Sequence, residues 1–374
     1  MIEQTDVFVI GGGPAGLAAA IAARNKGFGV VVADGTQWPI EKACGEGLMP
    51  ETVTALRDLG VNLDADDGHV MRGVRFIARG SEVEARFPVE CGIGMRRVAL
   101  HAKLVEHAKS CGVKLLWNTP VVGISRDGVT LAGETRTEGR LVRARWIVGA
   151  DGIGSRVRSW AGLDTTTQRD CRYAVRWHYR MRPWSDVLEV HWGERAQAYV
   201  TPVGADEVCV ATLSKHRGMN KAALADEFPE LARRLVGAEL TGRERGAVTM
   251  MQSFRHVQRG NIALVGDASG SVDAITGEGL SLGFRQAMAL ADALKRGDLS
   301  GYEAAHRRMA RRPALMGKLM LVLDGRAWLR ERAIRAMARD ARVFERLLEV
   351  HVGTKSRAHL AVTGAMLGWR LVGA

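Results

Sequence analysis

The feature that most constrains the fold is a glycine cluster directly after the first apolar run of the chain. Residues 7–10 suit a buried parallel strand, and residues 17–24 are alanine-rich and predict a helix. A second apolar run, residues 30–33, suits another strand. This order predicts a βαβ unit whose helix N-terminus faces a phosphate group. Between the first strand and the helix stand Gly11, Gly12, Gly13, Pro14, Ala15 and Gly16.

Each part of this cluster has a physical task in a dinucleotide-binding turn. Gly11 permits the tight turn, Gly13 lets the backbone approach a pyrophosphate, and Gly16 allows the helix to pack closely on the strand. Asp34 follows the second strand, where its carboxylate accepts hydrogen bonds from ribose hydroxyls and disfavours a 2′-phosphate. The pattern therefore favours FAD or NAD over NADP.

The rest of the chain predicts a Rossmann-like α/β fold with an inserted antiparallel sheet. Alternating residues over 74–87 and 171–214 predict the inserted strands, and a helix is expected over 97–110. The predicted division is a discontinuous nucleotide-binding domain, a substrate domain and a basic helical C-terminal region. These comprise residues 1–70, 92–165 and 255–300, then 71–91 and 166–254, and finally 301–374.

Two further motifs carry a resemblance to a known family. The run from Asp151 to Arg158 reads Asp-Gly-Ile-Gly-Ser-Arg-Val-Arg, and residues 266–270 read Gly-Asp-Ala-Ser-Gly. With the first glycine cluster, they resemble the FAD-dependent superfamily of aromatic hydroxylases and geranylgeranyl reductases. The resemblance implies a fold of the glutathione-reductase and p-hydroxybenzoate-hydroxylase type with tightly, non-covalently bound FAD. It also implies NAD(P)H or reduced flavin as a transient electron donor.

The same resemblance implies roles for individual residues. Asp267 is expected to contact the ribityl chain, and the turn at Gly277, Gly279 and Leu280 to open a helix against the flavin. Arg97 resembles the pyrophosphate-contacting arginine of the family. The other cofactor contacts expected from the resemblance are Lys42, Asp151 and a backbone contact to adenine at Val122.

Departures from the hydroxylase pattern bear on the reaction. Ser269 stands where hydroxylases usually carry a histidine, and the run 42–47, Lys-Ala-Cys-Gly-Glu-Gly, is more similar to the geranylgeranyl reductase branch. Cys44 resembles that branch's cysteine beside the flavin ring, where a thiol donates a proton; a small buried residue at a bend is the other interpretation. Glu46 either pairs with Lys42 or is solvated.

Aromatic residues of the predicted inserted sheet offer a candidate substrate wall. Trp177, Tyr179 and Tyr199 are expected either to cover the flavin or to pack in the core of the sheet. His178 and His191 are candidate proton-transfer groups, with a structural role as the alternative. No metal site is predicted, because the five cysteines are scattered and form no CxxC pair.

Charge is concentrated at the C-terminal end. The net charge is +12, and residues 301–374 hold 15 Lys/Arg against six Asp/Glu. These arginines lie among apolar residues at helical spacing, and this part of the sequence contains no nucleic-acid recognition motif. We therefore expect no nucleic-acid partner. Two interpretations remain: a solvated helical cap, or peripheral membrane contact that also uses the apolar run 360–369, too short to span a bilayer. The opening residues resemble no export signal, which favours a cytoplasmic protein.

The sequence thus predicts an FAD-dependent oxidoreductase. The first interpretation is a monooxygenase that uses O₂, through a flavin C4a-hydroperoxide, to hydroxylate a lipophilic aromatic or polyketide-type molecule of secondary metabolism. The alternative is an alkene reductase similar to the geranylgeranyl reductases. A third hypothesis is a flavoprotein that has lost catalysis and serves as a binding module. The sequence favours no particular oligomeric state.

Overall fold

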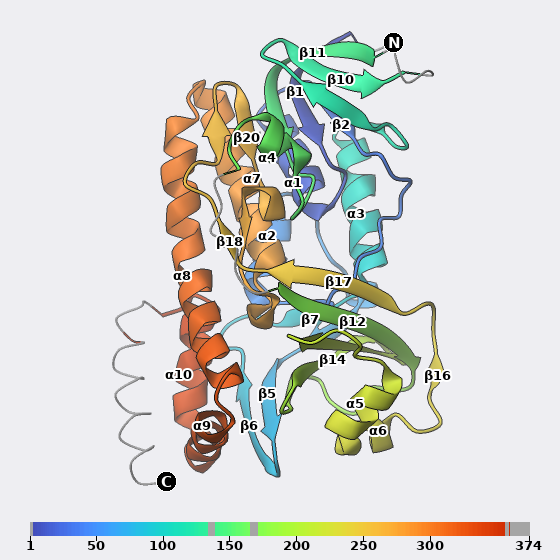
Figure 1. Ribbon diagram of the computed structural model, residues 1–374, viewed down its shortest axis with the longest axis vertical. Helices are drawn as coiled ribbons and strands as arrows, with labels where there is room; N and C mark the ends of the chain where they lie inside the picture. Colours follow the sequence, from blue (N-terminus) through green and yellow to red (C-terminus); the bar gives the residue numbers. More distant parts are fainter. Residues whose placement is uncertain (1–2, 134–138, 165–170, 356–358, 360–374) are drawn as a thin grey trace.

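A computed structural model describes residues 3–133, 139–164, 171–355 and 359. Figure 1 shows two β-sheets, one above the other, joined along one side by the long helix α8 (Ser300–Asp324). The apolar segment 360–369 lies outside the described residues. Within the described ranges, no helix combines the length and the apolar composition that crossing a bilayer requires.

The first sheet has a parallel centre. Its strand order is β20-β11-β1-β2-β8, and each of these neighbouring pairs is parallel. The antiparallel strands β10 and β9 extend from β11, and β19 pairs with β20. The bounds are β1 (Gln4–Ile10), β2 (Val30–Ala33), β8 (Lys114–Leu116), β9 (Val121–Ile124), β10 (Gly128–Ala132), β11 (Gly139–Gly149), β19 (Gln258–Arg259) and β20 (Ile262–Leu264).

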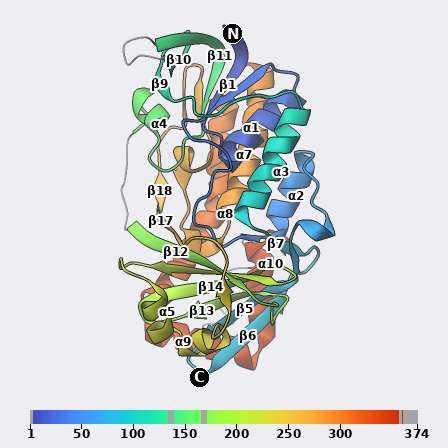
Figure 2. The same ribbon diagram turned by 90° about the vertical axis from the view of Figure 1, so that its right-hand side faces the viewer.

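Figure 2 shows the helices that cover one side of this sheet lying next to one another. Alternation along β1 explains how both faces are buried. Val7 and Val9 join the cluster formed with α1 and α7, while Phe8 and Ile10 join the cluster on the other face, which includes residues of β9 and β10. The helices are α1 (Pro14–Asn25), α2 (Pro50–Asp58), α3 (Arg97–Ser110) and α7 (Gly279–Arg296).

The second sheet has the strand order β16-β12-β15-β14-β13-β5-β6, with β17 also paired to β12. It was expected to be antiparallel throughout, but β5 and β13 run parallel, because the hairpin β5–β6 reaches this sheet from the nucleotide-binding segment. The bounds are β5 (Gly73–Ala78), β6 (Ser81–Arg86), β12 (Cys171–Arg180), β13 (Leu188–Trp192), β14 (Ala196–Gly204), β15 (Glu207–Ser214), β16 (Glu239–Leu240) and β17 (Arg245–Met250).

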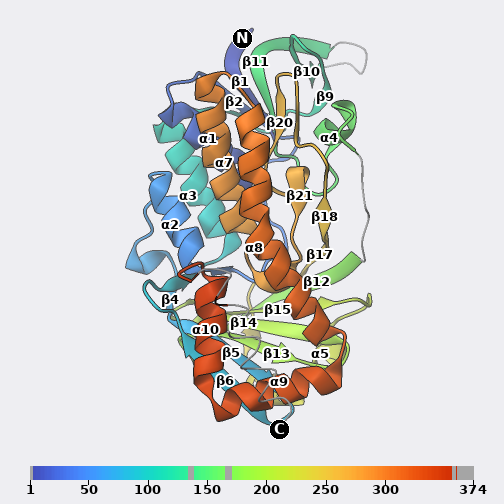
Figure 3. The same ribbon diagram turned by 90° about the vertical axis from the view of Figure 1, so that its left-hand side faces the viewer.

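Helices cover the second sheet on both sides. One side packs against α5 (Lys221–Glu227) and α6 (Pro229–Arg234), and the other against α9 (Ala327–Arg339) and α10 (Ala341–His351). Figure 3 shows α8 beside α7 and then continuing down to α9. The remaining elements are β3 (Gly47–Leu48), β4 (His69–Met71), β7 (Gly92–Gly94), β18 (Gln252–Ser253), β21 (Gly270–Ser271), α4 (Arg156–Trp160), η1 (Ala65–Asp67), η2 (Gly266–Ser269) and η3 (Ala274–Thr276).

Candidate active site

A cavity of about 880 Å³ lies between the two sheets and the C-terminal helices. Its polar half is formed by the glycine loops after β1, β11 and β20. Its apolar half is enclosed by the second sheet and by α8, α9 and α10. The apolar side chains lining it include Val74, Phe76, Leu188, Val190, Met316, Met320, Leu323, Met337, Phe344 and Leu348.

Packing within the protein explains two glycines of the first cluster. A Cβ at Gly16 would lie 1.9 Å from the carbonyl oxygen of Gly11, and one at Gly11 would lie 2.4 Å from the carbonyl oxygen of Ala150. Gly11 also has a φ of +111°, which disfavours other residues. These glycines therefore hold the loop, α1 and the end of β11 in close contact.

Packing within the protein does not explain why four other positions are glycine. At Gly13, Gly45, Gly154 and Gly279 an added Cβ would meet no atom within 4 Å, and φ is not in the left-handed region. All four line the cavity. A ligand that presses against the backbone explains why no side chain stands at these positions, and an extended dinucleotide such as FAD fits this arrangement.

Asp34 and His101 fix the first loop. The Asp34 carboxylate accepts hydrogen bonds from the backbone N–H of Gly12 (2.7 Å) and from the N–H and hydroxyl of Thr36 (2.8 and 2.7 Å), and it lines the cavity. Buried His101 lies with Nε2 2.8 Å from the Gly12 carbonyl oxygen and accepts the Ile40 N–H at Nδ1. Burial lowers the pKa of His101. No local pattern in the sequence indicated this role of His101, because its partner Gly12 is 89 residues away.

Charged groups flank the polar half. Lys42 and Asp267 both line the cavity, and the Lys42 ammonium lies 3.5 Å from the Asp267 carboxylate. Arg97 opens α3 and also lines the cavity, and its buried Nε has no hydrogen-bond partner among the described residues. An unpaired cationic donor beside a glycine loop suits the pyrophosphate of a dinucleotide.

The motif from Asp151 to Arg158 connects the loops. The Asp151 carboxylate accepts hydrogen bonds from the Ser155 hydroxyl (2.6 Å) and from two backbone N–H groups at the start of α4. The Arg158 guanidinium donates to the carbonyl oxygens of Ile153 and Ala268, both at 3.1 Å. These side chains therefore bond to the protein itself and hold the second and third glycine loops together.

The loop that carries Cys44 is held by a cluster of buried polar side chains that includes Glu46 and His178. Cys44 lines the cavity, and its Sγ is 3.4 Å from the backbone N–H of Glu46. Glu46 does not pair with Lys42 and is not solvated; its carboxylate lies 2.6 Å from Nε2 of His178. Arg96 and Arg176 donate to Nδ1 of His178, which puts the proton on Nε2. The cluster joins the Cys44 loop to β12.

Glu46, His178 and Cys209 offer three ligand atoms within 4.8 Å of one another. The two guanidinium groups on His178 oppose a metal cation at this position. Burial raises the pKa of the Cys209 thiol, which also disfavours the thiolate that a metal would need. The cluster is therefore better suited to holding the Cys44 loop than to binding an ion.

The structure separates the aromatic residues proposed as a substrate wall. Tyr199 lines the cavity, and its hydroxyl lies 2.9 Å from Gln197 and 3.3 Å from the carbonyl oxygen of Ile275. Trp177 and Tyr179 are not brought to the cavity; they are buried on the other face of the sheet, against α5 and α6. Because side chains alternate along β12, the neighbouring Arg176 lines the cavity instead.

Two other predicted residues lie apart from the cavity. His191 is buried against Phe228 and lies 3.1 Å from Glu189. Val122 is 46% exposed and does not line the cavity, whereas Val121, its neighbour in β9, does.

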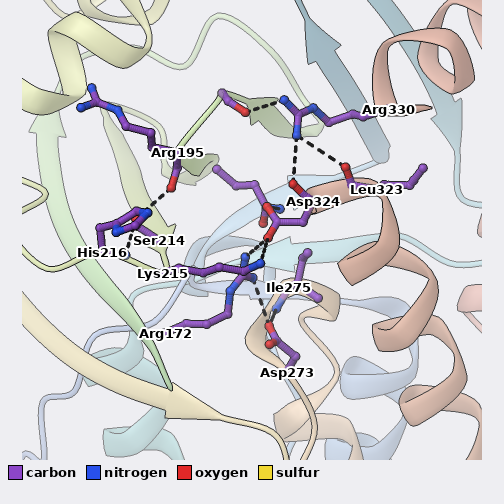
Figure 4. A network of polar contacts seen from close by, with 12 residues as sticks. Arg172, Arg195, Ser214, Lys215, His216, Asp273, Ile275, Leu323, Asp324 and Arg330 are labelled. Carbon is purple, nitrogen blue, oxygen red and sulfur yellow. Dashed lines mark hydrogen bonds and ion pairs between the residues drawn. The ribbon is translucent and has the colours of Figure 1, made fainter. Parts of the chain in front are cut away.

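An ion-pair network fixes the end of α8 to the second sheet, as Figure 4 shows. Asp324 accepts from Arg172 at 2.5 Å, and Gln197 donates to it at 2.8 Å. Arg172 also contacts Asp273, the residue that caps η3 in the flavin loop predicted from the sequence. Arg330 donates to the carbonyl oxygen of Asp324. The network therefore connects the C-terminal end of α8, which lines the apolar half of the cavity, to the loop that contains η3.

A second buried ionisable cluster was not predicted. Glu278, at the N-terminus of α7, lies 3.4 Å from Arg312 of α8 and 3.7 Å from His351 of α10. Glu51 and Arg285 complete the cluster, and His351 lines the cavity. Burial raises the pKa of Glu278 to about 7. The C-terminal helices thus contact the flavin loop through charged groups.

Comparison with known proteins agrees with this geometry. A family model described as an FAD binding domain matches residues 4–301. A menaquinone reductase of Mycobacterium tuberculosis is 28% identical over 321 residues, 80% of this chain and 78% of that protein. A digeranylgeranylglycerophospholipid reductase of Methanothermobacter thermautotrophicus is 27% identical over 80% of each chain. A flavoprotein/dehydrogenase structure from Cytophaga hutchinsonii superposes with a TM-score of 0.84 at 19% identity, covering 99% of this chain and 100% of that one.

Proposed function

The chain belongs to the FAD-binding-domain family and is an FAD-dependent oxidoreductase, and from this premise we propose that it reduces carbon–carbon double bonds of a lipophilic, isoprenoid-type molecule. The observation that carries the proposal is the apolar half of the cavity. Aliphatic side chains from the second sheet and from three helices enclose it, as an extended hydrocarbon chain requires. The names of the reductase relatives support the same substrate class.

Bound FAD supplies the two-electron redox chemistry, and the chain's own residues position the substrate and deliver a proton. Cys44 lines the cavity, so its Sγ is our candidate for the proton donor. Glu46 and His178 hold the loop that carries Cys44. NAD(P)H or reduced flavin is the proposed electron donor.

The test is product analysis with a polyprenyl quinone and a polyprenyl phospholipid, each with NAD(P)H under air and under nitrogen. A reductase adds two hydrogen atoms per double bond and works without oxygen. Cys44→Ala should retain bound FAD and lower turnover about a hundredfold, the usual scale for a lost general acid. Cys91→Ala is the matched control, because Cys91 is exposed and does not line the cavity. Equal activity of the two variants would remove Cys44 from the proposal.

A monooxygenase acting on a lipophilic aromatic or polyketide-type molecule is the second candidate. The same apolar enclosure supports it, because oxygen transfer from a flavin needs exclusion of water. In this case the product gains one oxygen atom, substrate stimulates O₂ consumption, and no product forms under nitrogen.

A further inference from the structure

The outer face of α8 carries a continuous stripe of basic and apolar residues. Its members are spaced three and four residues apart, so they lie on one face of the helix. Two of them are large apolar side chains, with Leu315 38% and Val322 45% exposed. The exposed members of the stripe are Arg308, Arg311, Leu315, Lys318 and Val322.

Helix α9 continues this surface. Trp328, the second residue of the helix, is 63% exposed, the largest exposed fraction among the described tryptophans. Arg335 and Arg339 follow it at seven and eleven residues, on the same face, and both are exposed. The opposite face of α9 packs inward through Ala333, Ile334 and Met337. One face of α9 is therefore apolar and buried, and the face exposed to solvent carries an aromatic ring together with arginines.

Every charged residue of the two stripes is basic. The nearby acidic groups are paired: Asp324 pairs with Arg172, and Glu331, at the edge of the same face of α9, pairs with Arg79. A surface that interleaves arginine and lysine with exposed Leu, Val and Trp suits a bilayer interface, where the ring enters the headgroup region and the cations meet anionic lipid. A nucleic-acid surface has no comparable need for exposed aliphatic side chains.

We propose that the outer faces of α8 and α9 dock this protein on the surface of a bilayer that contains anionic phospholipid. The inner faces of the same helices line the apolar half of the cavity through Met320, Leu323 and Met337. Docking therefore leaves one layer of helix between the lipid and the cavity. Figure 3 shows α8 and α9 together on the side of the molecule that this contact uses.

The test is sedimentation of the FAD-loaded full-length protein with vesicles of phosphatidylcholine, with and without phosphatidylglycerol. We expect binding to the anionic vesicles, weakened by salt because the attraction is between exposed charges. Trp328→Ser and the double variant Arg335→Glu/Arg339→Glu should each lower the partition coefficient about tenfold or more. Because all three residues are exposed, these variants should keep the FAD content and thermal stability of the parent protein.

Matched controls make the same chemical changes on other faces. Arg140→Glu/Arg143→Glu alters two exposed arginines of β11, and Val236→Ser removes a side chain that is 80% exposed after α6. These should bind vesicles as the parent does. The proposal is overturned if the parent ignores anionic vesicles, if controls and stripe variants lose equal affinity, or if duplex DNA binds and vesicles do not. Vesicle binding needs no turnover, so its failure is distinct from failure of the proposed reaction.

Discussion

The carboxylate of Glu46 and the imidazole of His178 meet 2.6 Å apart, fully buried, and join a loop of the nucleotide-binding half to the second sheet. Removing one partner leaves the other buried without its hydrogen bond. We expect His178→Ala to lower the free energy of unfolding by about 3 kcal/mol. A urea double-mutant cycle with Glu46→Gln should give a coupling energy above about 1 kcal/mol. Strictly additive effects would show that the contact does not hold the two parts together.

Gly13 gives a direct test of the cofactor site. Gly13→Ala adds a methyl group that meets no protein atom within 4 Å, so the apoprotein should fold normally. FAD affinity should fall about tenfold or more, because the methyl group occupies space at the proposed pyrophosphate contact. Titration of apoprotein by flavin fluorescence measures this. Gly123→Ala is the control, since its added Cβ is also uncrowded and Gly123 does not line the cavity. Undiminished FAD binding by Gly13→Ala would contradict the assignment.

Glu278 predicts a stability that falls as pH rises. Burial raises its pKa from 4.5 to about 7, so the folded protein binds this proton more tightly than the unfolded chain. The corresponding stabilisation is complete below pH 4.5 and is lost as pH rises through 7. It amounts to roughly 3 kcal/mol. Glu278→Gln should remove this dependence from urea unfolding measured across that range, whereas Glu345→Gln, at an exposed position, should not. The same slope in both variants would argue against the assignment.

The buried side chain of His306 predicts the opposite pH dependence, a stability that falls as pH falls. Its Nε2 lies 2.8 Å from the Ser269 hydroxyl, and burial lowers its pKa from 6.5 to about 4. Its contribution to stability is present above pH 6.5 and is lost as pH falls through 4, again by roughly 3 kcal/mol. His306→Gln should therefore unfold with less acid sensitivity in this window than the parent protein. Calorimetry at several pH values measures how the unfolding temperature of each protein depends on pH. The same loss of stability in acid for His306→Gln and the parent protein would refute the prediction.

Much of the nucleotide-binding half could be predicted from the sequence. The strand over residues 30–33 and the helix over 97–110 are confirmed, and so is the hairpin near residues 74–87 of the second sheet, because each depends on local periodicity and turn residues. The glycine-rich segments could be found for the same reason.

The rest depends on contacts between residues far apart in the chain. Arg172 and Asp324 are 152 residues apart, and Glu46 and His178 are 132 apart, so no local pattern announces either pair. Alternation along β12 correctly predicted two faces. The alternation does not indicate which face packs against α5 and α6. The expectation that Trp177 and Tyr179 line the substrate cavity was therefore wrong, because both are buried against these helices.

The match to the family model stops at residue 301, just where α8 begins at Ser300. The glycine loops and the second sheet thus lie within the matched stretch, and α8, α9 and α10, which close the other side of the apolar half of the cavity, follow it. Exchanging residues after 301 for another helical segment would therefore reshape one wall of the cavity and leave the three glycine loops as they are.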